Sequence, residues 1–248
     1  MPNSGHIDDL AAASHVLILT GAGISAESGI PTFRGINGLY EGMRVEDLAS
    51  PAGFAADPER VWQWYVMRAS AYGACEPNPG HRTLVEMAAA YPEFLISTQN
   101  VDGLHQKAGS PRVIELHGTI TTMRCTRCEH RAAFPLPWTG LPSCTSCGAM
   151  MRPDILWFGE TYRDGVLERT LEAAATCDVC ISIGTSGAVW TPVHVAMHAR
   201  AHGATLIDIN PNESELSGRS DHWLKGPAGE VLPRLWRDVH VLRQPSAG

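Results

Sequence analysis

The sequence predicts an α/β chain, in which a parallel sheet with helices on both faces is joined by a helical insertion and a metal-binding module. Three observations lead to this fold class. Short apolar runs rich in β-branched residues recur along the chain, helix-compatible segments lie between most of them, and four cysteines stand in two close pairs. Four or more alternating strand–helix units are typical of a doubly wound parallel sheet.

Five apolar runs are expected to form the strands of this sheet. The first, residues 16–20, feeds directly into Gly21 and a helix-compatible segment, giving a strand, a glycine turn and a helix. The other four expected strands are residues 94–98, 113–116, 179–183 and 205–209.

A long excursion, residues 32–92, separates the first two predicted strands. Its best helical segments are 58–72 and 81–90, and a Pro or Gly that marks a helix start stands at or before the beginning of each. Because this excursion is too long for one crossover, we expect a small inserted helical module.

Four cysteines follow the pattern C-x2-C-x15-C-x2-C, which lies within the spacing of a four-thiolate zinc site. They are Cys125, Cys128, Cys144 and Cys147. The surrounding segment, 119–153, has no core-sized apolar stretch of its own, so metal is expected to substitute for a core. A shell of four thiolates leaves no open position, so the zinc is predicted to be structural. Two local disulfides are the alternative, which the spacing and a reducing compartment disfavour.

The composition excludes several classes of function. The 248 residues carry 19 Lys and Arg against 26 Asp and Glu, and the net charge of −7 argues against a surface for nucleic acid. The N-terminal region has no basic stretch and no uninterrupted apolar run, so neither a signal peptide nor a membrane anchor is expected. We therefore expect a cytoplasmic protein that binds neither nucleic acid nor membranes.

Two further groups of residues could be mistaken for sites. Cys177 and Cys180 flank and enter an apolar strand, so we interpret them as buried core thiols and not as a redox centre. His194, His198 and His202 recur at every fourth position and are interpreted as a solvated helix face, since no nearby carboxylate is evident to orient them on a metal.

Glycine-rich or polar turns follow three of the predicted strands, at residues 21–23, 184–186 and 210–212. Each could be a plain turn, but together they converge on the edge where open α/β sheets bind their ligands. The first turn lets backbone amides approach a pyrophosphate. Ala26 stands where the dinucleotide fingerprint has its third glycine, and no acidic residue ends a second strand, so a hydride-transferring dehydrogenase fits poorly.

Several blocks of the sequence together resemble the sirtuins, the NAD-dependent protein-lysine deacylases. They are GAGISAESGIPTFR at 21–34, Gln99-Asn100-Val101-Asp102, His117-Gly118, the four cysteines and Phe158-Gly159-Glu160. The resemblance covers nearly the whole chain. It implies a Rossmann-like NAD-binding domain made of 1–31, 93–118 and 154–248, and a small domain made of the helical module 32–92 and the zinc module 119–153.

The resemblance also implies roles for individual residues. NAD is consumed, so that the products are nicotinamide and O-acyl-ADP-ribose. His117 matches the general base, and an imidazole suits that role because its pKa is near working pH. Asn100 and Asp102 match residues that orient the ribose and hold the nicotinamide carboxamide. The other expected NAD contacts are Gly21, Ala22, Gly23, Phe33, Arg34, Gln99, Gly184, Thr185, Ser186, Asn210 and Ala228.

The acylated protein is expected to bind as an added strand between residues 155–159, which include Leu156 and Phe158, and residues 187–190. Tyr65 and Arg68 fall on one face of the predicted helix, where a guanidinium beside a phenol suits a carboxylate. In sirtuins this pair marks enzymes that remove succinyl, malonyl or glutaryl groups. Ala49, aligned near the acyl channel, leaves room for such chains, and weaker acetyl removal is expected to persist.

Two other functions remain open at this level. A protein that only senses NAD or ADP-ribose would need the phosphate and adenine contacts but not the catalytic residues. Transfer of ADP-ribose to protein would use the same carbon of the cofactor and would leave labelled protein. The sequence identifies neither the protein substrates nor the oligomeric state.

Overall fold

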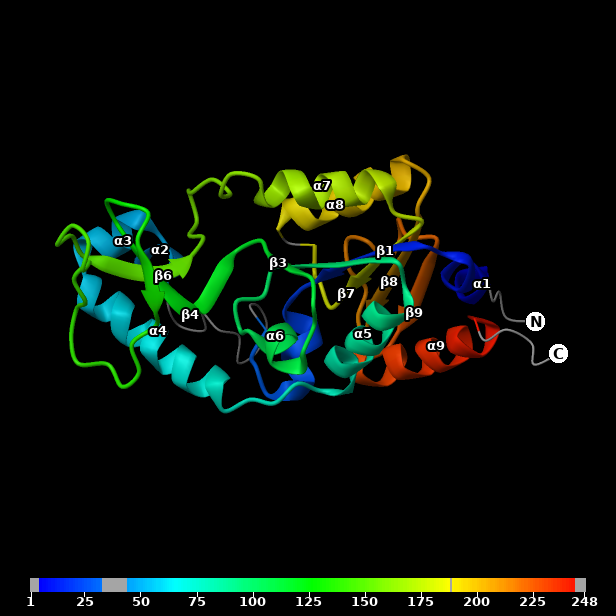
Figure 1. Cartoon of the computed structure of the whole chain (residues 1–248), viewed down its shortest axis with the longest axis horizontal. Coiled ribbons are helices and arrows are strands. Elements are labelled where there is room, and N and C mark those ends of the chain that lie inside the picture. Colours follow the sequence, from blue (N-terminus) through cyan, green and yellow to red (C-terminus); the bar gives the residue numbers. More distant parts are fainter. Residues whose placement is uncertain (1–4, 33–43, 188, 244–248) are drawn as a thin grey trace.

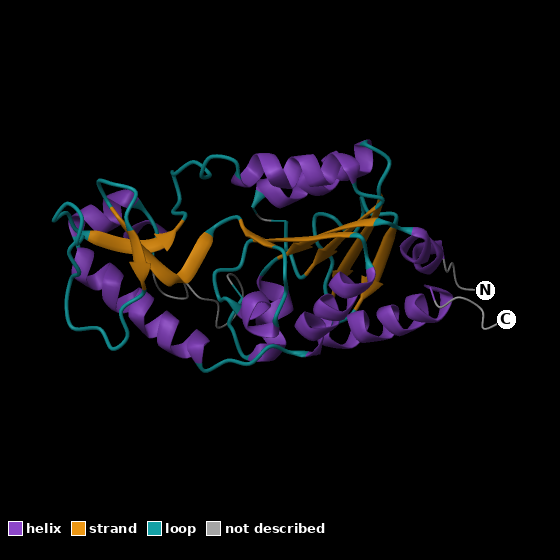
Figure 2. Ribbon diagram, in the orientation of Figure 1, coloured by secondary structure: helices purple, strands orange, loops and turns teal. Residues whose placement is uncertain are grey.

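The computed structural model describes residues 5–32, 44–187 and 189–243. The molecule is elongated, with a large parallel sheet toward the end that carries both termini and a small antiparallel sheet toward the other end (Figures 1 and 2). All neighbouring strands of the large sheet pair in parallel. In spatial order they are β3 (Val113–Glu115), β2 (Glu93–Thr98), β1 (His15–Thr20), β7 (Val179–Ile183), β8 (Thr205–Asn210) and β9 (His222–Lys225).

The five strands predicted from apolar runs are all present, and the fold class is confirmed. The sixth, β9, was not predicted because it lies at the sheet edge and its side chains alternate between partly buried and exposed. The helix predicted after Gly21 is a 3₁₀ helix, η1 (Ala22–Ser28). It ends at Gly29, whose left-handed φ of 87° suits a glycine.

Helices cover both faces of the large sheet. One face packs against α1 (Gly5–Ala12), α5 (Pro79–Ala90) and α9 (Ala228–Arg243), and the other against α7 (Val166–Thr176) and α8 (Trp190–Ala201) (Figure 1). Helix α5, expected within the inserted module, therefore contributes Leu84 and Met87 to the core of the large sheet. The short helix α6 (Leu104–Ala108) follows β2. No helix among the described residues is long and apolar enough to cross a membrane.

The small sheet has the order β5-β4-β6, with β4 (Gly118–Cys125), β5 (Arg131–Ala133) and β6 (Met151–Ile155). It shares one core with the helices α2 (Val45–Leu48), α3 (Pro51–Ala56) and α4 (Pro58–Gly73). Trp62 of α4 packs its ring 5.1 Å from that of Phe134 and donates a hydrogen bond from Nε1 to the carbonyl of Met151. The zinc segment thus shares an apolar core with α4. The sequence of residues 119–153 alone does not predict this shared core.

Helix α4 carries Tyr65 and Arg68, the two residues predicted to bind the acyl carboxylate. Asp57 caps its first turn by accepting a hydrogen bond from the amide of Arg60, and Pro58 occupies the first helical turn. The observed helix extends the predicted one by a single residue, Gly73. The capping signals therefore defined its start, and Tyr65 and Arg68 both lie in its buried middle.

Candidate active site

Polar residues meet at the carboxyl ends of the parallel strands. Gly21 follows β1, Gln99 follows β2, His117 lies just after β3, Gly184 follows β7 and Asn210 ends β8. Carboxyl ends of parallel strands lie at one edge of a sheet, which is where open α/β sheets bind ligands. The structure places these predicted residues at that common edge.

The glycines of the first turn press against the turn after β7. The amide of Gly21 donates to the carbonyl of Ile183 at 3.0 Å, and that of Gly23 to the carbonyl of Gly184 at 2.9 Å. A Cβ atom on Gly23 would lie 2.6 Å from Cα of Gly184, which itself has a φ of 61°. Close packing between two backbone turns therefore requires these glycines, in addition to any approach by a phosphate.

Asn100 and Asp102 form one buried hydrogen-bonded group with Ser25 of η1. Asn100 Nδ2 donates to the carbonyl of Gly21 at 3.1 Å and to Ser25 Oγ at 3.2 Å. The Ser25 hydroxyl donates to Asp102 Oδ2 at 2.8 Å, while Asp102 Oδ1 accepts from the amide of Leu104. Burial raises the pKa of Asp102, and these two hydrogen bonds and the positive charge of Arg68 oppose the rise. The bonds to Gly21 and Ser25 tie the loop after β2 to η1 and to the turn after β1.

A second set of hydrogen bonds joins β2, β7 and β8. Gln99 Nε2 donates to Thr185 Oγ1 at 2.9 Å, and Asn210 Nδ2 donates to the carbonyl of Thr185 at 2.8 Å. Thr185 is thus the common partner of two predicted NAD contacts, and it is itself buried.

The imidazole of His117 is oriented by the chain of β2. Its Nδ1 lies 3.1 Å from the carbonyl oxygen of Gln99. A carbonyl oxygen can only accept, so Nδ1 carries the proton and Nε2 carries the lone pair. Burial lowers the pKa of His117 to about 4, so the ring is neutral at pH 7. Nε2 is therefore available to accept a proton.

Arg68 of α4 is buried with aromatic rings around it. Its side chain lies with Cζ 4.5 Å from the Trp64 ring centroid and 5.3 Å from that of Tyr65. Nε and Nη2 both donate to the hydroxyl of Tyr72 at 3.2 Å. Within the described part of the chain, the Arg68 guanidinium has no carboxylate in ion-pair contact. The buried carboxylate of Asp102 interacts with this positive charge electrostatically, but no carboxylate among the described residues contacts it directly.

The segment after β6 lies against both the turn between α2 and α3 and the turn at His117. The amide of Phe158 donates to the carbonyl of Ala49 at 3.0 Å, and that of Leu156 donates to the carbonyl of His117 at 2.9 Å. Ala49 is buried, whereas the Phe158 side chain is 54% exposed. The structure therefore places Leu156 against His117 and Phe158 against Ala49.

The four predicted metal ligands form one cluster. Their sulfur atoms all lie within 4.8 Å of one another, with Cys125 and Cys147 at 3.4 Å and Cys128 and Cys144 at 3.7 Å. Zn–S bonds of about 2.3 Å in a tetrahedron separate sulfur atoms by about 3.8 Å. The four thiols are thus positioned to bind one zinc ion. They form the one group of three or more neighbouring ligand residues among those that the structure describes.

Comparison with known proteins identifies the family. A family model described as "Sir2 family" matches residues 21–191. The chain belongs to the Sir2 family. A protein of Leptospira interrogans named NAD-dependent protein deacylase is 45% identical over 228 residues, which cover 89% of this chain and 91% of the relative. NAD-dependent protein deacylase 2 of Pyrobaculum aerophilum is 43% identical, and the match covers 94% of both chains.

Solved structures agree with this assignment. A Sir2 homologue in complex with NAD superimposes with a TM-score of 0.91 at 39% identity, covering 98% of this chain and 96% of that one. A mutant Sir2 homologue in complex with ADP-ribose has a TM-score of 0.92 at 39% identity, covering 96% of this chain and 97% of that one. The prediction of a Sir2-family chain is confirmed.

Three residues with clear structural roles in this Sir2-family site were not predicted. Ser25 lies within the 21–34 block and links Asn100 to Asp102, a contact that the block alone does not indicate. Tyr72 is one helical turn beyond Arg68, and that spacing could have indicated it. Trp157 stands beside Phe158, and nothing in its spacing pointed to α4, where its Nε1 donates to the Tyr65 hydroxyl at 2.9 Å.

Three of the remaining predicted NAD contacts lie in described parts of the structure, and two do not. The amide of Gly229 donates to Glu27 Oε2 at 2.7 Å, which places the start of α9, including Ala228, beside η1. Ala22 opens η1, and Ser186 lies two residues after Gly184. Phe33 and Arg34 lie outside the described residues.

The cysteine pair and the histidine row that the sequence analysis interprets as structural differ in burial. Cys177 and Cys180 are buried, as predicted, and burial raises the pKa of Cys177 to about 12. The rings of His194, His198 and His202 form a row along α8, with centroids 6.2 Å and 4.2 Å apart. His202 is exposed and the other two are partly buried, so the helix face is only partly solvated.

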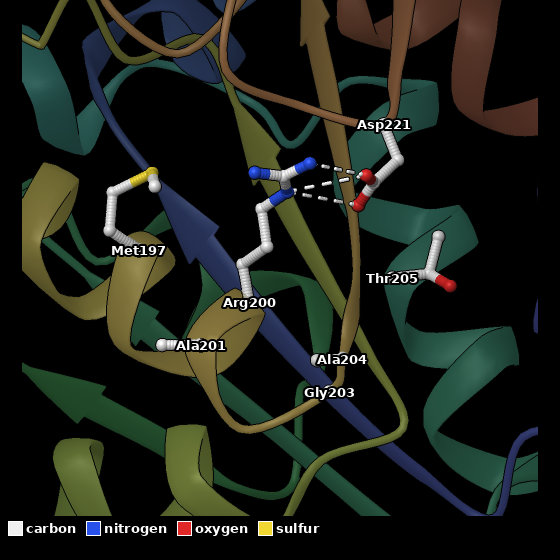
Figure 3. Close-up of a pocket in the computed structure, with 7 residues that line it drawn as sticks. All are labelled: Met197, Arg200, Ala201, Gly203, Ala204, Thr205 and Asp221. Carbon is white, nitrogen blue, oxygen red and sulfur yellow. Dashed lines mark hydrogen bonds and ion pairs between the residues drawn. The ribbon is translucent and has the colours of Figure 1, made fainter.

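One pocket lies at the opposite end of the sheet from this Sir2-family site (Figure 3). Arg200 at the end of α8 and Asp221 before β9 form an ion pair there, 2.9 Å apart. Thr205, which begins β8, also lines the pocket. Because the arginine already has its carboxylate partner, the pocket offers no unpaired charge to a ligand.

Proposed function

We propose that this Sir2-family chain, an NAD-dependent protein deacylase, removes succinyl, malonyl or glutaryl groups from lysine side chains and removes acetyl groups less efficiently. The observation that carries the proposal is the buried guanidinium of Arg68, which has no carboxylate in direct contact in the described part of the chain. Leaving a charge buried without a partner is costly. A carboxylate at the end of the acyl chain would supply the missing partner.

The surroundings of Arg68 support a carboxylate ligand. Two of its nitrogen atoms already donate to Tyr72, which fixes the plane of the guanidinium. The hydroxyl of Tyr65 accepts from Trp157 and retains its own proton for donation. Burial raises the pKa of Tyr65, so that proton stays in place at pH 7. A guanidinium and a phenol that both donate suit a carboxylate better than an acetyl methyl group.

The residues at the strand ends support the chemistry. NAD, when bound, supplies the electrophilic ribose carbon from which nicotinamide leaves, and O-acyl-ADP-ribose is the proposed second product. The closely packed glycine turns hold the loops after β1 and β7 against each other at the edge where the cofactor would bind. Asn100 and Asp102 orient the ribose and the carboxamide, and His117 accepts the proton of a ribose hydroxyl at Nε2.

We also propose that the acylated peptide binds as an added strand along the segment after β6, which the chain holds in a fixed position. The amides of Leu156, Trp157 and Phe158 are all bonded within the chain, to His117, Glu160 and Ala49. This segment is therefore held in position before a peptide arrives, and recognition through its backbone predicts loose sequence preference. We also propose a cytoplasmic location, which suits a site of four reduced thiolates.

Mass spectrometry of one peptide that carries acetyl, succinyl, malonyl or glutaryl lysine tests the proposal, with and without NAD. We expect NAD-dependent loss of the acidic acyl groups, release of nicotinamide and slower loss of acetyl. His117→Tyr should abolish turnover in a folded protein. Equal rates for all four peptides would refute the acyl preference, protein labelled with ADP-ribose would favour ADP-ribosyl transfer, and NAD binding without turnover would favour a sensor.

A further inference from the structure

Tyr162 lies directly beside His117, although nothing in the proposed function uses it. The two rings stack with centroids 6.0 Å apart and planes 26° apart. The hydroxyl oxygen of Tyr162 lies 3.5 Å from His117 Nε2. This is the nitrogen that carries the lone pair, because Nδ1 donates to the carbonyl of Gln99.

Ion pairs on both sides fix the position of Tyr162. Two residues earlier, the Glu160 carboxylate accepts from the amide of Trp157 at 2.8 Å and pairs with Arg152 at 2.5 Å. One residue later, Arg163 Nη2 donates to the Asp154 carboxylate at 2.5 Å and to the Asp154 carbonyl at 3.1 Å. The chain on either side of Tyr162 is therefore tied to β6, so its place beside His117 is built into the fold.

The separation of the two atoms suits a shared ligand better than a direct bond. At 3.5 Å the contact between Oη and Nε2 is at the outer limit of hydrogen bonding. An oxygen atom about 2.8 Å from each of them could contact both at once, since two such distances together exceed their separation. A hydroxyl group is the ligand that fits, because its oxygen accepts from the phenol while its proton goes to the imidazole.

We propose that Tyr162 is a further catalytic residue, which donates a hydrogen bond to the ribose hydroxyl whose proton His117 accepts. This inference rests on the proposed role of His117. The O–H bond of that hydroxyl breaks and an N–H bond forms at Nε2. The electron pair stays on the oxygen and forms its new bond to the acyl carbon, while the π bond between that carbon and the lysine nitrogen opens and its electron pair passes to the nitrogen. Tyr162 keeps its own proton throughout and stabilises the negative charge that develops on the oxygen.

Tyr162→Phe tests the proposal, because it removes the hydroxyl and keeps the stacked ring. We expect kcat to fall by about ten- to hundredfold, KM for NAD to rise by about three- to tenfold through the lost hydrogen bond, and KM for the peptide to change by less than about twofold. Tyr91→Phe is the matched control, since the Tyr91 hydroxyl donates to the carbonyl of Leu10 in the core of the large sheet. It should change the melting temperature and leave kcat unchanged. A kcat of Tyr162→Phe equal to that of the unmodified protein would refute the proposal.

A binding experiment provides a readout that does not depend on turnover. Calorimetry should show that Tyr162→Phe weakens ADP-ribose binding by about three- to tenfold, the effect of one neutral hydrogen bond. ADP-ribose that lacks the 2′- or the 3′-hydroxyl completes a double-mutant cycle. For one of these two analogues the effect of Tyr162→Phe should disappear, and an equal effect on all three ligands would overturn the proposal.

The two measurements separate this inference from the proposed function. Coupling in the binding cycle without any deacylation would support the contact and refute the activity. Deacylation with neither a kcat effect nor coupling would support the activity and refute the role of Tyr162.

Discussion

The indole nitrogen of Trp157 donates a hydrogen bond to the hydroxyl of Tyr65 at 2.9 Å, across 92 residues of sequence. Trp157 lies in the segment proposed to bind the peptide, and Tyr65 lies in the helix proposed to bind the acyl carboxylate. The bond therefore fixes the distance between the two halves of the substrate site. Trp157 also packs 5.2 Å from the ring of Phe54, which keeps water away from this contact.

Arg68→Met should remove most of the activity on succinyl-lysine and retain activity on acetyl-lysine. A charge-assisted contact contributes roughly 1.5–3 kcal/mol, so the ratio of the two kcat/KM values should change by about ten- to hundredfold. Steady-state kinetics on a matched pair of peptides measures this ratio.

Arg60→Met is the control for this variant, because Arg60 lies on the same helix with an exposed side chain. It should leave both activities unchanged. If Arg68→Met instead lowers the two activities equally in a folded protein, Arg68 has a structural role and the chain is a general deacylase.

Tyr72→Phe should weaken the acyl preference without abolishing it. The variant removes the hydroxyl that accepts from both Nε and Nη2 of Arg68, so the guanidinium loses its orientation but keeps its charge. KM for the succinyl peptide should rise by about three- to tenfold, and KM for the acetyl peptide should not change. A parallel rise in both KM values would show that the bond only supports folding.

Purified protein should contain one zinc ion per chain, and Cys128→Ser should lose it together with much of the stability of the small sheet. Elemental analysis and thermal melting measure the two effects. Cys75→Ser is the control, because Cys75 lies outside the cluster and should alter neither. Metal-free protein with the four thiols paired as disulfides would contradict the zinc assignment.

Stability should decrease as the pH falls from 7 toward 4. Burial lowers the pKa of His81 to about 4 and that of His105 to about 3, against 6.5 in the unfolded chain. Below pH 6.5 the unfolded state binds protons that the folded state does not, so each histidine removes about 1.4 kcal/mol per pH unit until its folded pKa is reached. His105→Gln should reduce the slope of unfolding free energy against pH in denaturant titrations. An unchanged slope would mean that other groups dominate.

The sequence predicted the features that arise from local patterns. The apolar runs of β1 and β7 indicate buried strands because both faces of a parallel sheet are covered, and Asp57 and Pro58 mark the start of α4. The motif spacing alone predicted the thiol cluster. Family resemblance, not periodicity, supplied the role of His117.

The features that escaped prediction depend on contacts between distant segments. No pattern in residues 119–153 showed that Phe134 would pack on Trp62, because the partner lies in α4. The position of Tyr162 beside His117 depends on the ion pairs of Glu160 and Arg163 with β4 and β6, which no local spacing encodes. Tertiary packing decided these relationships.

The core that α4 shares with the small sheet links two properties that are usually treated separately. One side of the helix carries Arg68 and faces the proposed acyl carboxylate, while Trp62 anchors the helix to Met151 and Phe134 of the zinc-bearing sheet. A change of sequence around the metal can therefore alter which acyl group is accepted, without touching any residue that contacts the substrate. Evolution of substrate choice in this chain need not be confined to the residues of the acyl pocket. A redesign of that pocket has to preserve the packing of α4 on the zinc-bearing sheet.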